Sequence, residues 1–139
     1  MKKVIALFMI LIILVGCNTE LSFSEISLES SNVNVQFFFK GIENENGVHL
    51  YMDGEKSLYV FLNGKNVIQN EKAIQFSDFD VDSEGDTLTI YYTEEKTEDY
   101  SNDTLHHQIV YKIDKDKNYA NVKGIKNGEE VAFGAVSGN

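Results

Sequence analysis

Leu58-Tyr59-Val60-Phe61 is apolar at every position. Successive side chains of a β-strand point to opposite faces of the sheet, so a strand with one solvated face alternates apolar and polar residues. This stretch does not alternate. It therefore predicts a central strand that is packed on both faces.

Around this stretch, apolar residues recur with a period of two, and no segment keeps helical spacing. The pattern predicts an all-β fold: an antiparallel β-sandwich or barrel of about 7–9 strands joined in hairpins. The positions that share a face are Val33, Val35, Phe37 and Phe39; Val48, Leu50 and Met52; Leu58, Val60 and Leu62; Leu88, Ile90 and Tyr92; Leu105, Ile109, Tyr111 and Ile113; and Val131, Phe133 and Ala135.

Glycine-containing turns separate these runs, because tight hairpins need residues that tolerate positive φ angles. The segment Glu94 to Thr104 is expected to be an exposed loop, and Asp114 to Asn118 a hairpin turn. The predicted turns are Asn46-Gly47, Asp53-Gly54, Asn63-Gly64, Glu84-Gly85-Asp86 and Asn127-Gly128.

The amino terminus has the features of a cleaved export signal. Two lysines precede twelve apolar residues, Val4 to Val15, and a small glycine follows them. Twelve helical residues span about 18 Å, which is short of the roughly 20 residues that cross a bilayer. The alternative is an uncleaved amino-terminal anchor.

The stretch Leu14-Val15-Gly16-Cys17 resembles the lipobox of bacterial lipoproteins of the Gram-positive type. The resemblance implies a diacylglycerol, with acyl chains such as palmitate, on the Cys17 thiol and cleavage before it. It also implies a lipid-anchored protein on the extracytoplasmic face of the cell membrane. Cys17 is the sole cysteine, so no internal disulfide is possible.

The chain is thus expected to divide into a signal peptide (1–16), an acylated Cys17 with a flexible tether (17–32), and a single β domain (33–139). Ser, Glu and Asn dominate the tether segment, where apolar residues are too sparse for a core. A first edge strand around Phe23 to Leu28 is the alternative.

Without residues 1–16 the chain has ten lysines, no arginine and 22 acidic residues, a net charge of −12. This charge repels nucleic acid and anionic lipid surfaces, so cationic peptides, metal ions or neutral ligands are the easier partners. The same charge also serves solubility. The oligomeric state does not follow from the sequence.

The alternating acids from Asp78 to Asp86 include Asp80-Val81-Asp82-Ser83-Glu84-Gly85, which resembles the start of an EF-hand loop. The twelfth position is Tyr91 rather than the required glutamate. We expect the solvated face of an edge strand, with Phe79 and Val81 inward. A looser calcium site at the turn remains an alternative.

The three histidines do not predict a metal centre. His106 and His107 are adjacent and would point to opposite faces of a strand, and His49 lies far away in the sequence. His107 is in register with the apolar face and is expected to be a hydrogen-bonded core residue. No catalytic residue, metal or cofactor is predicted.

Four aromatic residues, Phe38, Tyr59, Phe61 and Tyr91, lie opposite the main apolar stripes. On neighbouring strands they would form an exposed patch for a peptide or glycan. Alternatively, a second sheet or a loop buries them.

The segment Leu58 to Ile113 is similar in outline to small β-rich lipoproteins, including domains that resemble protease complex inhibitors, although their Gly-Gly-Tyr turn is absent. Together these features indicate a binding module for a polypeptide or envelope component. The alternative is an envelope enzyme such as a peptidyl-prolyl isomerase or hydrolase.

The lipobox predicts a defined mature terminus. Intact-mass spectrometry should find a chain that begins at Cys17 and carries a diacylglycerol. The Cys17→Ala variant should keep residues 1–16, and an unmodified full-length wild-type chain in the cytosol would contradict the prediction.

Overall fold

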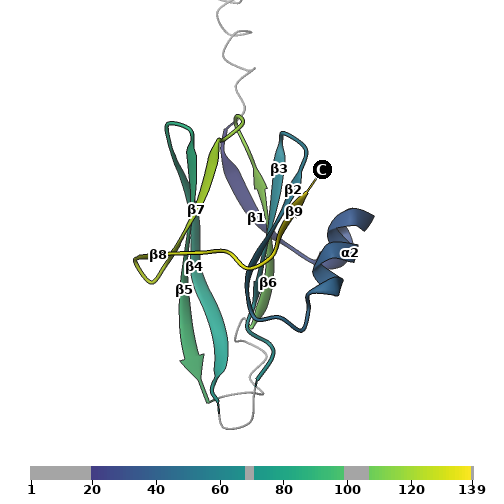
Figure 1. Cartoon of the computed structure of the whole chain (residues 1–139), viewed down its shortest axis with the longest axis vertical. Coiled ribbons are helices and arrows are strands. Elements are labelled where there is room, and N and C mark those ends of the chain that lie inside the picture. The colour runs from purple at the N-terminus through teal and green to yellow at the C-terminus, as the bar shows by residue number, and fades with distance from the viewer. Residues whose placement is uncertain (1–19, 68–70, 99–106, 139) are drawn as a thin grey trace, which may run out of the picture.

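The computed structural model describes residues 20–67, 71–98 and 107–138, which fold as a β-sandwich (Figure 1). Within these residues nine strands form sheets of five and four, so the prediction of an all-β sandwich of about 7–9 strands is confirmed. Sheet A has the order β1 (Ser22–Ile26), β6 (Gln108–Asp114), β3 (Ser57–Asn63), β2 (Gly47–Asp53) and β9 (Val136–Gly138). Sheet B has the order β4 (Ala73–Glu84), β5 (Thr87–Thr97), β7 (Asn121–Lys126) and β8 (Glu129–Val131).

The sheets are mixed rather than purely antiparallel. Strand β9 runs parallel to β2, and β7 runs parallel to β5. The chain passes from β8 in sheet B across to β9 in sheet A (Figure 1), so its last described segment links the two layers.

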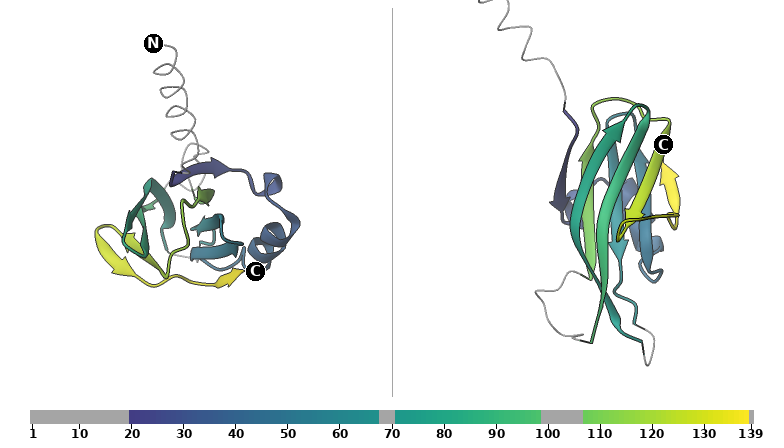
Figure 2. Two further views of the ribbon diagram at one scale, coloured as in Figure 1. Left: turned by 90° about the horizontal axis from the view of Figure 1, so that it is seen from above. Right: turned by 90° about the vertical axis from the view of Figure 1, so that its left-hand side faces the viewer.

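Strand β3 is the middle strand of sheet A, and the prediction that it is covered on both faces is confirmed. Its Leu58, Val60 and Leu62 side chains join the core between the sheets. Its Tyr59 and Phe61 side chains join a second apolar cluster on the outer face of sheet A. In the left-hand view of Figure 2, sheet B, sheet A and a helix form three successive layers.

The helix is α2 (Val33–Gly41), so the strand predicted over Val33 to Phe39 is wrong, as is the expectation that no segment has helical spacing. Val35 and Phe39 are fully buried, whereas Phe37 is 83 % exposed. Val35, Phe38, Phe39 and Ile42 stand at positions i, i+3, i+4 and i+7, which lie on one face of a helix.

Asn32 fixes where the helix begins. Its side-chain oxygen accepts a hydrogen bond from the backbone N–H of Val35 at 3.0 Å. This bond caps one of the N–H groups that the first helical turn leaves without a partner.

Residues 22–26 form β1, an edge strand that pairs with β6 from Ser22↔Asp114 to Ile26↔Val110. The interpretation of residues 17–32 as a tether is therefore wrong from Ser22 onward, and the edge-strand alternative is correct. The Phe23 ring packs edge-on against Phe79 of β4 at 5.1 Å, so β1 also helps to close the sandwich along this side.

Gly47, Gly54, Gly85 and Gly128 have positive φ angles, as the predicted turns require. Gly64 does not, and the turn predicted at Asn63-Gly64 is wrong. A Cβ atom on Gly64 would lie 2.6 Å from the Ile74 Cβ, so glycine is needed here for the close approach of two segments.

Two further loop predictions are corrected by the sheet order. The segment Asp114 to Asn118 leads from β6 in sheet A towards β7 in sheet B and does not close a hairpin. Residues 94–97 belong to β5 instead of a loop. Glu98 follows β5, and residues 99–104 of that predicted loop lie outside the described residues, as does Leu105. Of Val131, Phe133 and Ala135, only Val131 is in a strand.

None of the helices in the described part of the chain is long and apolar enough to cross a bilayer.

The docking of α2 can be tested with two phenylalanines of the same helix. Phe39→Ala should lower the free energy of unfolding by about 3–5 kcal/mol, because it empties a fully buried site. The matched Phe37→Ala change removes an exposed ring and should cost no more than about 0.5 kcal/mol. Urea unfolding measures both, and equal losses would show that α2 does not pack as described.

Candidate functional site

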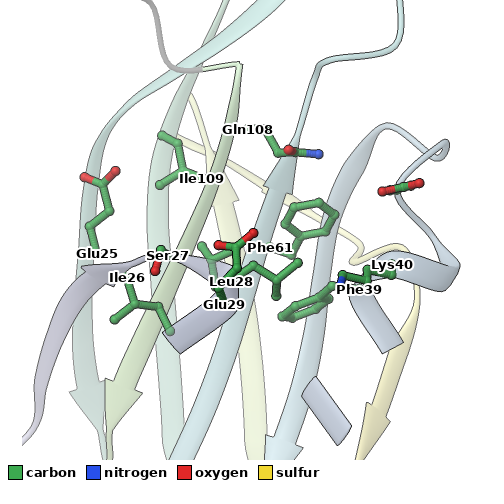
Figure 3. A pocket seen from close by; sticks show the side chains of 12 residues that line it. Glu25, Ile26, Ser27, Leu28, Glu29, Phe39, Lys40, Phe61, Gln108 and Ile109 are labelled. Carbon is green, nitrogen blue, oxygen red and sulfur yellow. The ribbon is translucent and has the colours of Figure 1, made fainter. Parts of the chain in front are cut away.

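A groove of about 290 Å³ lies on the outer face of sheet A, between α2 on one side and β1 with the short helix η1 (Leu28–Ser30) on the other (Figure 3). Its volume suits one or two side chains of a larger ligand. The lining residues are Glu25, Ile26, Ser27, Leu28, Glu29, Phe39, Lys40, Glu43, Phe61, Gln108, Ile109 and Val110.

The floor of the groove is apolar and firmly packed. The Phe39 and Phe61 rings lie 4.9 Å apart between centroids, and both side chains are buried. Figure 3 shows these rings with Leu28 at the centre of the groove. Because the floor belongs to the cluster that α2 buries, its shape is set by the packing of the fold.

Glu29 is positioned by contacts between η1 and α2. The Gln36 side-chain amide, in α2, donates to the backbone oxygen of Glu29 at 3.3 Å and to that of Ser31 at 2.8 Å. Within η1, the Ser30 N–H donates to the Ser27 oxygen at 3.1 Å. These bonds fix the backbone that carries the Glu29 carboxylate.

Glu43 is held by two asparagines that bind its backbone oxygen. The Asn63 side-chain amide donates to it at 2.9 Å, and the Asn66 amide donates to it at the same distance. Asn63 is fully buried and also donates to the Glu45 oxygen, so the connection between α2 and β2 is tied to the end of β3. This places the Glu43 carboxylate at the rim.

The rim carries a local excess of negative charge. Neither the Glu29 nor the Glu43 carboxylate has an ion-pair partner among the described residues, and Lys40 is the basic side chain that lines the groove. Glu25 also lines the groove, from β1, and it pairs in register with Tyr111 of β6. Two exposed carboxylates beside apolar side chains are chemically suited to a cation with an apolar stem.

His49 is buried, and both of its ring nitrogens bind backbone groups. Nδ1 accepts from the Ala135 N–H at 2.9 Å, which places the ring proton on Nε2, and Nε2 donates to the Glu45 oxygen at 3.0 Å. The histidine therefore links β2 to the segment before β9 and has no lone pair left for a metal.

His107 is hydrogen-bonded, as predicted, but it is only partly buried and does not belong to the core. Its Nδ1 donates to the Ile74 oxygen at 2.6 Å and so joins the start of β6 to β4. Its Nε2 is buried without a hydrogen-bond partner in the structure as described. His106 lies outside the described residues. In residues 20–67, 71–98 and 107–138, no group of three or more His, Cys, Asp or Glu residues converges to hold a metal ion.

The acidic run lies on β4, at the edge of sheet B, as predicted. Asp80 and Asp82 are exposed, while Phe79 and Val81 pack against the core. Asp78 has a φ of 53° at a β-bulge, where the register with β5 shifts. Such bulges and exposed charges are ways in which an edge strand avoids pairing with other chains.

The exposed aromatic patch is not formed. Tyr59 and Phe61 are buried beneath α2, Phe38 belongs to α2 itself and is partly buried, and Tyr91 lies on sheet B and is 38 % exposed. The alternative that these rings are covered is correct for Tyr59 and Phe61, but the cover is a helix instead of a sheet or loop.

A broader hollow of about 530 Å³ lies over sheet B around Tyr91. Its walls are mostly polar side chains of β5 and β7, and Lys123 in it pairs with Glu130 at 3.6 Å. Its aromatic lining residues are Tyr91 and Tyr92. The groove beside α2 lies over two buried, closely packed rings, Phe39 and Phe61, so we take it as the candidate site.

Comparison with protein-family models, curated proteins and solved structures finds no match to this chain. Cys17, the predicted lipid-attachment residue, lies outside the described residues.

The sequence analysis missed Glu29 and Glu43. Glu29 fell in the segment predicted to be a tether, and Glu43 followed a segment predicted to be a strand. The stripe of Val35, Phe38, Phe39 and Ile42 after Asn32 could have revealed α2, and with it the neighbourhood of both carboxylates.

Three tyrosines have raised pKa values. Burial, and after it the charge of Glu94, raises the pKa of Tyr92 from 10.0 to about 12. Burial and then Glu25 raise the pKa of Tyr111. Burial, followed by the hydrogen bond to Asp116, raises that of Tyr119.

The Tyr92 shift predicts a loss of stability in alkali. The folded state favours the neutral Tyr92 phenol. The contribution of this group to the free energy of unfolding is therefore complete below pH 10 and is lost as pH rises through about 12. The Tyr92→Phe variant should therefore lose less stability than the wild type between about pH 9 and pH 11, as measured by urea midpoints. Tyr91→Phe, at the neighbouring exposed position, is the control and should follow the wild type. Parallel curves for all three proteins would refute the prediction.

Proposed function

We propose that this protein is a lipid-anchored, extracytoplasmic binding module whose groove beside α2 takes a basic side chain of a polypeptide. The observation that carries the proposal is the pair of carboxylates, Glu29 and Glu43, that stand without ion pairs beside the floor of Phe39 and Phe61.

A lysine side chain matches this groove in both of its parts. Its four-carbon stem can lie against the partly exposed Ile26 and Leu28 side chains, while its ammonium group donates hydrogen bonds to one of the rim carboxylates. Hydrogen bonds between two charged groups are stronger than neutral ones. The ligand chemistry therefore combines an apolar contact with a charge-assisted one.

The charge of the whole chain acts in the same direction. Residues 17–139 carry a net charge of −12, and such a field raises the rate at which cationic partners encounter the surface. This attraction weakens as salt is added, because exposed charges are screened within about 10 Å at 0.1 M ionic strength. A basic peptide is accordingly a better partner than an anionic polymer.

The extracytoplasmic address rests on the sequence. The similarity of Leu14-Val15-Gly16-Cys17 to a lipobox, the short apolar run before it and the lone cysteine all support it. A diacylglycerol supplies the two chains that stable membrane anchoring requires.

The groove can be tested with the acetylated peptide Gly-Lys-Leu-Lys-Gly, labelled with a fluorophore, and the purified lipidated protein in neutral detergent. The double variant Glu29→Gln/Glu43→Gln should raise the Kd by about tenfold at low salt, because two charge-assisted bonds are weakened. Fluorescence anisotropy measures this change.

A matched control removes two charges elsewhere. Asp82→Asn/Glu84→Gln, on the exposed face of β4, lowers the net negative charge equally and should change the Kd by less than about twofold. If both double variants weaken binding to the same degree, only the overall charge matters and the groove is not the site.

A further inference from the structure

We propose that the ligand of the groove is a polypeptide segment presented at the membrane surface, within about 30 Å of the lipid anchor. This inference rests on the proposed function, because it needs both the acyl anchor on Cys17 and the groove as binding site. It names the class of partner that the proposed function leaves open.

The chain between the anchor and the fold is very short. Leu21 already packs against the core between the sheets, and β1 begins at Ser22. Four residue steps separate Cys17 from Leu21, so even a fully extended chain covers only about 14 Å. The anchor therefore holds one end of the sandwich close to the bilayer.

The pairing of the strands shows which end this is. Ser22 pairs with Asp114, and Asp114 pairs with Ser57 at the start of β3. The β2–β3 hairpin and the β4–β5 hairpin lie at the same end of the sandwich (Figure 1). Strand β1 runs away from this end towards the groove.

The height of the groove follows from the length of β1. Ile26, which lines the groove, lies five residue steps beyond Leu21, or about 17 Å at the rise of a strand. With the tether, the maximum distance from the anchor to this edge of the groove is about 31 Å. This limit holds for any tilt of the domain, because it depends only on chain length.

The direction of the groove also fits a membrane partner. It lies on the outer face of sheet A, beside strands that run along the long axis of the sandwich (Figures 1 and 2). With this axis upright, the groove opens sideways along the membrane. The net charge of −12 disfavours a domain that lies flat on an anionic bilayer.

The test uses vesicles that carry the lipidated protein and a lipidated probe. The probe is the peptide Gly-Lys-Leu-Lys-Gly with a benzophenone cross-linker, joined to its lipid by either five Gly/Ser residues or 40 prolines. The proline spacer holds the peptide about 120 Å from the bilayer. Cross-linking yield is measured for both probes at equal density.

The protein with its natural tether should cross-link to the short-spacer probe at least about fivefold more than to the long-spacer probe, because only the former is confined within reach. A protein with 40 prolines inserted between Thr19 and Glu20 should show the opposite preference. Equal yields for both probes with the natural tether would overturn the inference.

These experiments distinguish a failure of the membrane-partner inference from a failure of the proposed function. If the free peptide still binds through Glu29 and Glu43 in detergent but the spacer preference is absent, the groove stands and the membrane partner is refuted. If cross-linking to the short-spacer probe is unchanged in the Glu29→Gln/Glu43→Gln variant, the groove itself is refuted, and an unmodified Cys17 refutes the anchor.

Discussion

The whole structure depends on the burial of β3 on both of its faces. Leu58, Val60 and Leu62 require cover on one side of sheet A, and Tyr59 and Phe61 require it on the other. Sheet B supplies the first cover and α2 supplies the second. Because a nine-residue helix is too narrow to cover the outer face of five strands, a groove remains between it and β1. The candidate site is thus a direct result of how the outer face of sheet A is covered.

Much of the fold could be predicted from the sequence, because strands such as β5 carry apolar residues at every second position and glycine turns separate several of the strands. The segment Val33 to Phe39 is an exception. Its alternating valines and phenylalanines fit a strand, yet the same residues with Phe38 and Ile42 also fit a helix, and the Asn32 cap favours the helix. Gly64 is a similar case, since a glycine needed for close approach to Ile74 has the same appearance in a sequence as one needed for a turn.

The candidate site could not be predicted, because its parts meet only through tertiary packing. The carboxylates of Glu29 and Glu43 come from the two ends of the helical cover and are placed by amides of Gln36 and Asn63 that bind backbone oxygens. These side chain to backbone bonds span seven and 20 residues of sequence and leave no local pattern. The same applies to His49, whose acceptor nitrogen meets the Ala135 N–H from 86 positions away. What the sequence does show is the chemistry available: many carboxylates, few cations and one cysteine.

The parallel pairing of β9 with β2, and the pairing of β1 with β6, have a consequence for how the protein folds. The amino-terminal half of the chain is synthesised first. Strand β1 can pair only after β6, up to Asp114, has been made, and β2 can pair with β9 only after Val136 has been made. Such pairings between distant parts of a chain close slowly, because a long loop must be ordered before any contact forms. The edge of β1 therefore stays unpaired until β6 has joined sheet A, and that of β2 until β9 has joined it, and during that interval these edges can pair with other chains.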